Sequence, residues 1–230
     1  MADFDARPKT RAKTRAKTRS ARIQAKSASR RQQRKAELRG AIIEAAEALF
    51  LEHGYEHFSL RQVAEAIGYS PTTIYLHFAN KDELLFTVVL EGFMRFADML
   101  KAAYDSAEHP RDKLTAIGRA YLEFGLNYPV HYRLMFMQRG EFLTRALPEG
   151  YADDCDAPIE SFAVLTRTLE ECQQAGILRP GEVVHYANLV WMTIHGIVAL
   201  TISMDYITRA NAEKAFADYE TMLQAFLLPA

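Results

Sequence analysis

Three helix-start signals fall between Ser59 and Asn80, and their spacing constrains the fold more than any other feature of the sequence. Ser59 is followed three residues later by Gln62, which is the pattern of a capping box. Ser70 precedes Pro71, so a capping residue meets a proline at the first helical position, where the missing N–H is not needed. Asn80 is followed three residues later by Glu83, which is a second capping box at the start of a further helix. A helix of about eight residues, a short turn and a second short helix is the spacing of a helix-turn-helix.

The rest of the chain beyond Glu37 also has the pattern of helices. Apolar residues recur at spacings of three and four, while no useful period-two segment and no Asn-Gly or Asp-Gly hairpin signal occurs. We expect an all-α protein of about nine or ten helices, with an amino-terminal three-helix helix-turn-helix domain and a carboxy-terminal helical bundle. The expected divisions are a basic arm at 1–37, the helix-turn-helix domain at 38–84 and the bundle at 85–230, joined by a long helix at Lys81–Tyr104.

The first 35 residues carry 13 Lys or Arg against two acids, whereas the rest of the chain carries 15 basic and 27 acidic residues. From Lys9 this arm repeats KTRA, KTRA and KTRS, and it has almost no large apolar side chains, so we expect it to be disordered on its own. Its period of four is close to a helical turn, so ordering as a helix on DNA is an open alternative. A basic arm on an acidic body indicates a polyanionic partner. We expect Arg11, Arg15 and Arg19 of the repeat to contact DNA; the alternative is a solvated tail.

The cysteines and the motifs argue against several other classes of protein. Cys155 and Cys172 form no close pair, which disfavours a disulfide framework or a zinc site and fits a reducing cytoplasm. No G-x-S-x-G, H-E-x-x-H or Gly-rich phosphate loop occurs, so we expect no enzyme and no cofactor. Val183–Met204 is long and uncharged enough to span a bilayer. Its polar residues, including His185 and His195, favour a helix buried in protein and no membrane partner.

A long series of residues in fixed order runs from Leu38 to Leu85, with GYSPTTIYLHFANKDELL at its centre. The series comprises Ala46, Leu49, Phe50, Gly54, Tyr55, Ser59, Val63, Ala64, Gly68, Ser70, Thr73, Tyr75, His77, Phe78, Lys81 and Leu84. It resembles the DNA-binding domain of the TetR family of repressors. The resemblance implies a cytoplasmic, nucleoid-associated homodimer that binds a palindromic site in double-stranded DNA and is released by a small-molecule effector.

The second short helix of the motif, Pro71–Phe78, is the expected recognition helix. Small hydroxylated residues at its start suit contacts with phosphates or base edges, and two longer side chains further along can reach the backbone. Ile74 and Phe78 lie four apart and are expected to face the domain core instead. The resemblance adds a lysine at the start of the next helix as a phosphate contact. The candidate DNA-binding residues are therefore Ser70, Thr72, Thr73, Tyr75, His77 and Lys81. For Ser70 the alternative is that it only caps the helix, and for His77 the alternative is that it packs against the protein.

The carboxy-terminal part resembles one subgroup of TetR-like domains through Trp191, His195 and Gly196, which match a W-x-x-x-H-G pattern. Residues 121–137 also look like that subgroup. The resemblance implies a domain for ligand sensing and dimerisation. Pro158–Ala175 and Val183–Tyr206 are its expected dimer helices. We expect an apolar cavity lined by some of Phe124, Tyr128, Met135, Trp191 and His195, although ordinary core packing is the alternative for each.

Two functions of other classes stay open from the sequence. One is a nucleoid-like architectural protein that binds DNA mainly through the basic arm, without regard to base sequence. The other is a metabolite-binding protein or enzyme that has lost DNA binding. A discrete palindromic footprint would distinguish a repressor from the first, and retention of genomic fragments at low salt would distinguish it from the second.

Overall fold

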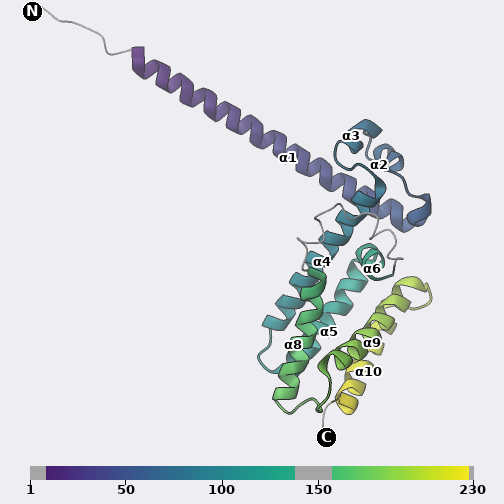
Figure 1. Cartoon of the computed structure of the whole chain (residues 1–230). Helices are drawn as coiled ribbons and strands as arrows, with labels where there is room; N and C mark the ends of the chain where they lie inside the picture. The colour runs from purple at the N-terminus through teal and green to yellow at the C-terminus, as the bar shows by residue number, and fades with distance from the viewer. Residues whose placement is uncertain (1–8, 138–156, 228–230) are drawn as a thin grey trace, which may run out of the picture.

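The computed structural model describes residues 9–137 and 157–227, with residues 9–25 described by their backbone alone. Within these ranges the chain forms nine α-helices and no strand, which confirms the predicted all-α fold (Figure 1). The helices are α1 (Lys9–His57), α2 (Leu60–Ala66), α3 (Pro71–Tyr75), α4 (Lys81–Asp105), α5 (Pro110–Asn127), α6 (Pro129–Phe136), α8 (Ala157–Gln174), α9 (Val183–Ser203) and α10 (Arg209–Leu227).

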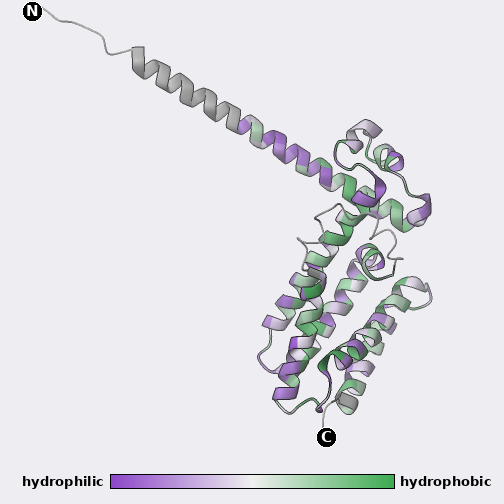
Figure 2. Ribbon diagram, viewed as in Figure 1, coloured by the Kyte–Doolittle hydropathy of each residue, from purple (hydrophilic) through white to green (hydrophobic). Residues whose placement is uncertain are grey.

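Helix α1 is much longer than the sequence predicts. The arm was expected to be disordered over residues 1–37, but α1 continues back to Lys9 and projects from the body as a straight rod (Figure 1). The physical reason is composition: no Gly or Pro interrupts the chain from Lys9 to Arg39, and its Ala, Lys, Arg and Gln are good helix formers. The side chains of residues 26–36 are all exposed and mainly hydrophilic (Figure 2).

The last part of α1 packs with α2 and α3 into a small head. Ile42, Ala46 and Phe50 form its buried face, at the spacing that the sequence predicts. Positive φ angles at Gly54 and Gly68 mark the end of this face and the turn between α2 and α3. Glycine is suited to both places because residues with a Cβ rarely adopt positive φ.

The larger part of the molecule is a bundle in which α4 packs against α5 and α8, and α9 packs against α5, α8 and α10. Helix α4 begins in the head and runs unbroken into the bundle. The division between residues 84 and 85 therefore stays a prediction. Among the described helices, α9 is the one long and apolar enough to span a membrane by length and composition. Its side formed by Ala187, Val190, Ile194 and Val198 is buried within the bundle.

Candidate nucleic-acid interface and bundle cavity

Helix α3 presents hydroxyl groups and an aromatic ring on the outside of the head. Ser70 caps the helix, because its Oγ accepts a hydrogen bond from the Thr73 backbone N at 3.2 Å. The hydroxyls of Ser70 and Thr73 lie 2.9 Å apart and bond to each other. Thr72 is exposed, and Tyr75 has 57% of its surface exposed. The structure thus brings these four candidates together on one outer surface.

Helix α3 ends earlier than predicted. It was expected to reach Phe78, but it stops at Tyr75 and continues as a turn. Ile74 and Phe78 are both buried, so the predicted inner face is retained. The turn allows Phe78 to enter the core although the helix has ended.

His77 and Lys81 are held differently from the other candidates. His77 is half-buried, and burial lowers its pKa, with Lys35 and Arg39 adding to the effect. It is therefore neutral at pH 7 and offers a phosphate no charge. Lys81 donates a hydrogen bond from Nζ to the backbone oxygen of Tyr55 at 2.8 Å and lies 4.1 Å from the centre of that ring. Its visible role is to join α1 to α4, and its phosphate contact stays a prediction.

Basic residues of α1 lie beside the turn that follows α3, and the sequence analysis did not single them out. The Arg39 guanidinium lies 4.6 Å from the centre of the Phe78 ring, and Lys35, one turn earlier, is exposed. Arg31, Lys35 and Arg39 follow one another at spacings of four, which would have placed them on one side of a helix had the arm been recognised as helical. The predicted contacts Arg11, Arg15 and Arg19 lie further along α1, where only the backbone is described.

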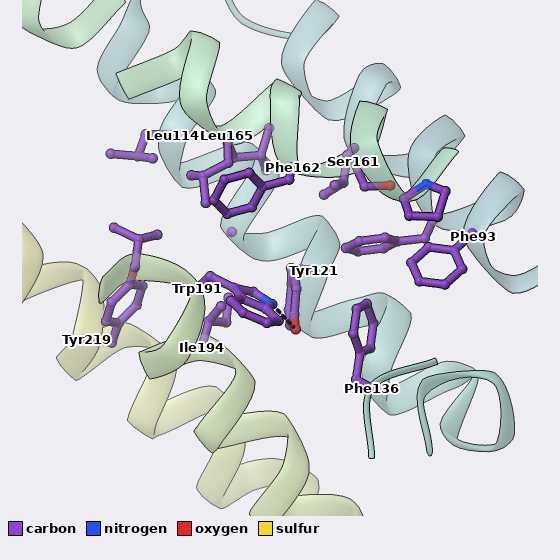
Figure 3. Close-up of a pocket in the computed structure, with 16 residues that line it drawn as sticks. Phe93, Leu114, Tyr121, Phe136, Ser161, Phe162, Leu165, Trp191, Ile194 and Tyr219 are labelled. Carbon is purple, nitrogen blue, oxygen red and sulfur yellow. Dashed lines mark hydrogen bonds between the residues drawn. The ribbon is translucent and has the colours of Figure 1, made fainter. Parts of the chain in front are cut away.

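A cavity of about 290 Å³ lies within the bundle, between α4, α5, α8 and α9 (Figure 3). Its wall is mainly aromatic and aliphatic, and six helices contribute to it. The lining residues are Phe93, Phe96 and Leu100 of α4; Leu114, Ile117, Gly118 and Tyr121 of α5; Phe136 of α6; Pro158, Ser161, Phe162 and Leu165 of α8; Val190, Trp191 and Ile194 of α9; and Tyr219 of α10. Apolar cavities of this kind, with few polar groups, are typical of sites for small molecules.

A chain of hydrogen bonds runs from the cavity wall into the core. Trp191 Nε1 donates to Tyr121 Oη at 3.1 Å, as Figure 3 shows. The hydroxyls of Tyr121 and Tyr132 lie 2.9 Å apart, and Tyr132 Oη lies 2.6 Å from His195 Nδ1. Burial raises the pKa of Tyr121 to about 12 and that of Tyr132 further, and it lowers the pKa of His195. All four groups are therefore uncharged at neutral pH.

The predicted cavity residues fall into two groups. Trp191 lines the cavity, and His195 lies behind the wall through its bond to Tyr132. Phe124, Tyr128 and Met135 do not line it. Phe124 is fully buried against Phe96, Tyr128 stacks with Arg95, and Met135 packs where α6 passes Gly92. The lining residues of α4 were missed, although Phe93, Phe96 and Leu100 recur in the sequence at the spacings of three and four that put them on one side of a helix.

Head and bundle meet at a buried pair between α1 and α6. Glu47 Oε1 lies 3.4 Å from His131 Nε2, and both side chains are largely buried. Burial raises the pKa of Glu47 to about 7, and repulsion from Glu91 and Glu44 adds to it. Burial also lowers the pKa of His131 to about 4, with a smaller contribution from Arg95. At pH 6 both groups therefore favour their neutral forms.

The substitution Glu47→Gln is expected to stabilise the protein at pH 8 and to have little effect at pH 4. The folded state holds the Glu47 proton more tightly than the unfolded chain, so the stability linked to this group falls as pH rises from 4.5 to about 7. Because the side chain is partly exposed, we expect a gain of about 1–2 kcal/mol at pH 8. Thermal melts at both pH values measure it. The exposed Glu52→Gln on the same helix is the control, and equal gains for both variants would contradict the assignment.

Two family profiles match this chain. Residues 42–88 match the profile described as bacterial regulatory proteins of the tetR family, and residues 114–226 match the tetracyclin repressor-like carboxy-terminal domain. The first range contains the head and the second contains most of the cavity wall. Together the two matches include α3, the predicted recognition helix, and the Trp191–His195 segment. Membership of the W-x-x-x-H-G subgroup stays a prediction.

Solved structures of similar fold include several regulators. A tetR-family regulatory protein from Rhodococcus RHA1 has a TM-score of 0.70 and 22% identity, with 84% of this chain and 97% of that one covered. The ketosteroid transcriptional regulator KstR2 of Mycobacterium tuberculosis has a TM-score of 0.65 and 21% identity, covering 84% and 95%. The fatty acid degradation regulator FadR from Bacillus halodurans has a TM-score of 0.65 and 19% identity, covering 81% and 93%. At these identities the likeness shows the shared fold.

Proposed function

The chain belongs to the tetR family of bacterial regulatory proteins, and from this premise we propose that it is a repressor released from its operator by a small apolar molecule. That it is a DNA-binding transcriptional regulator follows from the family. The repression, the release by a ligand and the residues that carry them are the proposal. Regulators of this family are in general soluble cytoplasmic proteins, and association with the nucleoid belongs to the proposal as well.

The observation that carries the proposal is that α4 contacts both candidate sites. Its first turn is tied to the head through Lys81 and Tyr55, and its later turns supply Phe93, Phe96 and Leu100 to the cavity wall. A molecule that fills the cavity contacts α4 directly. It can shift the head only as far as its affinities for the two arrangements differ. The same helix was expected from the sequence to couple the two domains.

A homodimer is the proposed form of the repressor, with α8 and α9 at its interface. Both helices expose large apolar side chains in the single chain: Ile159 of α8 is 71% exposed, and Val184, Met192 and Leu200 of α9 are each about half exposed. Exposed apolar surface of this kind is typical of subunit interfaces. Two recognition helices in a symmetric dimer would read a palindromic site in successive major grooves.

The basic arm is proposed to add affinity rather than base specificity. As a helix with side chains it is about 10–12 Å wide, which exceeds the roughly 6 Å width of the minor groove. A rod of this width fits contacts along the phosphate backbone or in a major groove better than insertion into a minor groove. Arg and Lys neutralise phosphates without reading base sequence.

Two substitutions test the reading surface. Thr73→Ala and Tyr75→Ala are expected to weaken operator binding at least tenfold, because each removes a side chain on the outer surface of α3. The melting temperature is expected to change little, since neither residue is buried in the core. Operator fragments for the assay are first selected from genomic DNA. The control is the exposed Lys101→Ala on α4; normal DNA binding by either α3 variant would refute its assigned role.

The rod-like arm also favours a second function, that of an architectural protein binding DNA without regard to sequence. Residues 26–35 alone expose five Lys or Arg with no acid among them. Footprinting separates the two functions. Protection of one palindrome supports the repressor, and uniform protection along the fragment supports the architectural protein.

Support for an apolar effector comes from the cavity and from the named relatives. The wall is built mainly from Phe, Leu, Ile and Val side chains. Two similar structures are named as a ketosteroid regulator and as a fatty acid degradation regulator. Screening apolar compounds for release of the protein from its operator tests this part of the proposal.

A further inference from the structure

The wall of the bundle cavity has few polar groups, and none of them is charged at neutral pH. Among the described lining residues there is no Lys, Arg, Asp, Glu or His. The polar groups are the hydroxyls of Tyr121, Ser161 and Tyr219 and the indole N–H of Trp191. Burial raises the pKa values of both tyrosines, so both stay protonated. His195 lies behind this wall and is neutral because burial lowers its pKa.

Such a wall selects against ions. A carboxylate or an ammonium group that enters an apolar cavity loses its hydration, and the loss is compensated only by an opposite charge or by several hydrogen bonds. The described wall supplies no opposite charge. An uncharged molecule loses far less on entry and gains the burial of its apolar surface.

The hydrogen-bond chain behind the wall has a defined direction. Trp191 Nε1 is a donor only, so Tyr121 Oη accepts from it at 3.1 Å. At the other end, Tyr132 Oη lies 2.6 Å from His195 Nδ1. A phenol is a better donor than a neutral imidazole N–H, and an imidazole nitrogen is the better acceptor, so Tyr132 donates to Nδ1. The Tyr132 hydroxyl hydrogen is then used. Tyr121 Oη also lies 3.5 Å from His195 Nδ1, but that nitrogen already accepts from Tyr132 at the shorter distance, so Tyr121 donates to Tyr132 Oη across 2.9 Å.

This direction decides what Tyr121 offers to a ligand. Its hydroxyl hydrogen is committed to Tyr132, and one of its lone pairs accepts from Trp191. What remains at the cavity wall is a second lone pair, which is an acceptor. A carbonyl or ether oxygen of a ligand finds no donor at this point, whereas a hydroxyl or N–H finds a partner.

We propose that the effector is an uncharged, mainly apolar molecule that carries one hydrogen-bond donor directed at Tyr121 Oη. This inference rests on the proposed function, because it assumes that the cavity receives the effector. It goes beyond that function by specifying that the effector is uncharged and that it donates, rather than accepts, the hydrogen bond at Tyr121. Alcohols, phenols and secondary amines on an apolar skeleton fit it, and free carboxylates, phosphates and thioester conjugates of charged carriers do not.

The charge is tested with two probes that share one skeleton. N-Phenyl-1-naphthylamine is neutral, and 8-anilino-1-naphthalenesulfonate adds a sulfonate to the same ring system. Fluorescence titration of the full-length protein without DNA is expected to give at least tenfold tighter binding of the neutral probe. Equal or tighter binding of the sulfonate in the cavity, or binding of neither probe, would overturn the proposal.

A cavity-filling variant identifies the signal that belongs to the cavity. Leu165→Trp places a large ring among the lining residues and is expected to abolish the neutral-probe signal. Ala102→Trp, at an exposed position on α4, is the matched control and is expected to keep it. Fluorescence that persists in Leu165→Trp arises elsewhere and is subtracted for both probes. Melting temperatures of the two variants show that each remains folded, and retention of the whole neutral-probe signal in folded Leu165→Trp would overturn the proposal.

The donor is tested by displacement of the neutral probe with two biphenyls. 4-Phenylphenol has an O–H donor, whereas 4-methoxybiphenyl has only an acceptor. In the natural protein the phenol is expected to displace the probe at a concentration at least fivefold lower. In Tyr121→Phe this preference is expected to vanish, because the acceptor is gone. Equal displacement by both compounds in the natural protein, or an unchanged preference in the variant, would contradict the assigned polarity.

These outcomes are separable from those of the proposed function. Probe binding is measured without DNA, and release of operator fragments is measured independently. If neutral donors bind in the cavity but do not release DNA, the ligand chemistry stands and the release mechanism fails. If only charged molecules release DNA through the cavity, the repressor function stands and this inference fails.

Discussion

Deletion of residues 1–35 will flatten the dependence of DNA affinity on salt by several units per chain, while the preferred operator stays the same. The segment carries 13 Lys or Arg, and each phosphate that it neutralises contributes a slope of about −0.9 to log K against log salt. If about half of these cations engage phosphates, the slope changes by about 6 units. The ratio of the DNA affinity of the full-length protein to that of the shortened protein then falls by roughly 10³-fold as salt rises from 50 mM to 200 mM.

The head is expected to survive this deletion. Its buried face on α1 begins at Ile42, and the side chains of residues 26–36 are exposed. Binding isotherms of full-length and shortened protein at four or more salt concentrations measure the two slopes. A second variant with Lys26, Arg30, Arg31 and Arg34 all changed to Gln keeps the length and the helix formers but removes four exposed charges. It is expected to flatten the slope in part; equal slopes for all three proteins would show that the arm does not touch DNA.

The head could be predicted closely because its signals are local. Ser59, Ser70 and Asn80 each cap the helix that the sequence assigns to them. A capping box also predicts that the Gln or Glu side chain accepts a hydrogen bond from the backbone N–H of the capping residue. Here Gln62 accepts from the Ser59 hydroxyl instead, and Glu83 accepts from the Ala79 backbone N–H. A cap is decided within three or four residues of chain, which is the range that a sequence pattern covers.

The arm was misjudged because two local rules compete in it. Low apolar content predicts disorder, whereas an uninterrupted run of good helix formers allows a helix. The folded part of α1 supplies the first turns, so the extension avoids the cost of nucleating a separate helix. Composition alone does not include this contribution from the neighbouring head.

The cavity was predicted in kind but only partly in its residues, because it depends on packing between distant segments. Three of the five candidates were drawn from residues 121–137, yet the wall combines side chains from six helices. The hydrogen bond between Trp191 and Tyr121 joins positions 70 residues apart. Helical spacing states which residues share a side of one helix, but it does not state which helix that side meets.

The contact between α5 and α9 holds this arrangement, and Gly125 allows it. A Cβ at Gly125 would overlap Val198 Cγ1 and would lie 3.2 Å from Tyr132 Cδ2. Val198 and Tyr132 are both fully buried, so neither can move aside freely. Gly125→Ala is therefore expected to push α9 away from α5 and to lower the stability by about 2–3 kcal/mol. For a chain of this size that is a fall in melting temperature of about 5–10 °C.

Gly40→Ala is the matched control, because Gly40 also lies in a helix but a Cβ there meets no atom within 4 Å. It is expected to stabilise the protein by about 0.5–1 kcal/mol, as removal of an exposed helical glycine normally does. A double variant separates the close contact from other effects. In Gly125→Ala with Val198→Ala the atom that clashes is gone, so the combined loss is expected to be smaller than the sum of the two single losses.

The same substitution is expected to reach the cavity. Val198 follows His195 by three positions on α9. Tyr132 lies against Gly125 and is also hydrogen-bonded to His195. Moving α9 outward lengthens the 2.6 Å bond between Tyr132 and His195 and frees the Tyr132 hydroxyl hydrogen. Tyr121 can then donate as well as accept, so folded Gly125→Ala is expected to lose its preference for 4-phenylphenol over 4-methoxybiphenyl. Additive losses in the double variant, together with an unchanged preference, would show that α5 and α9 do not depend on this close approach.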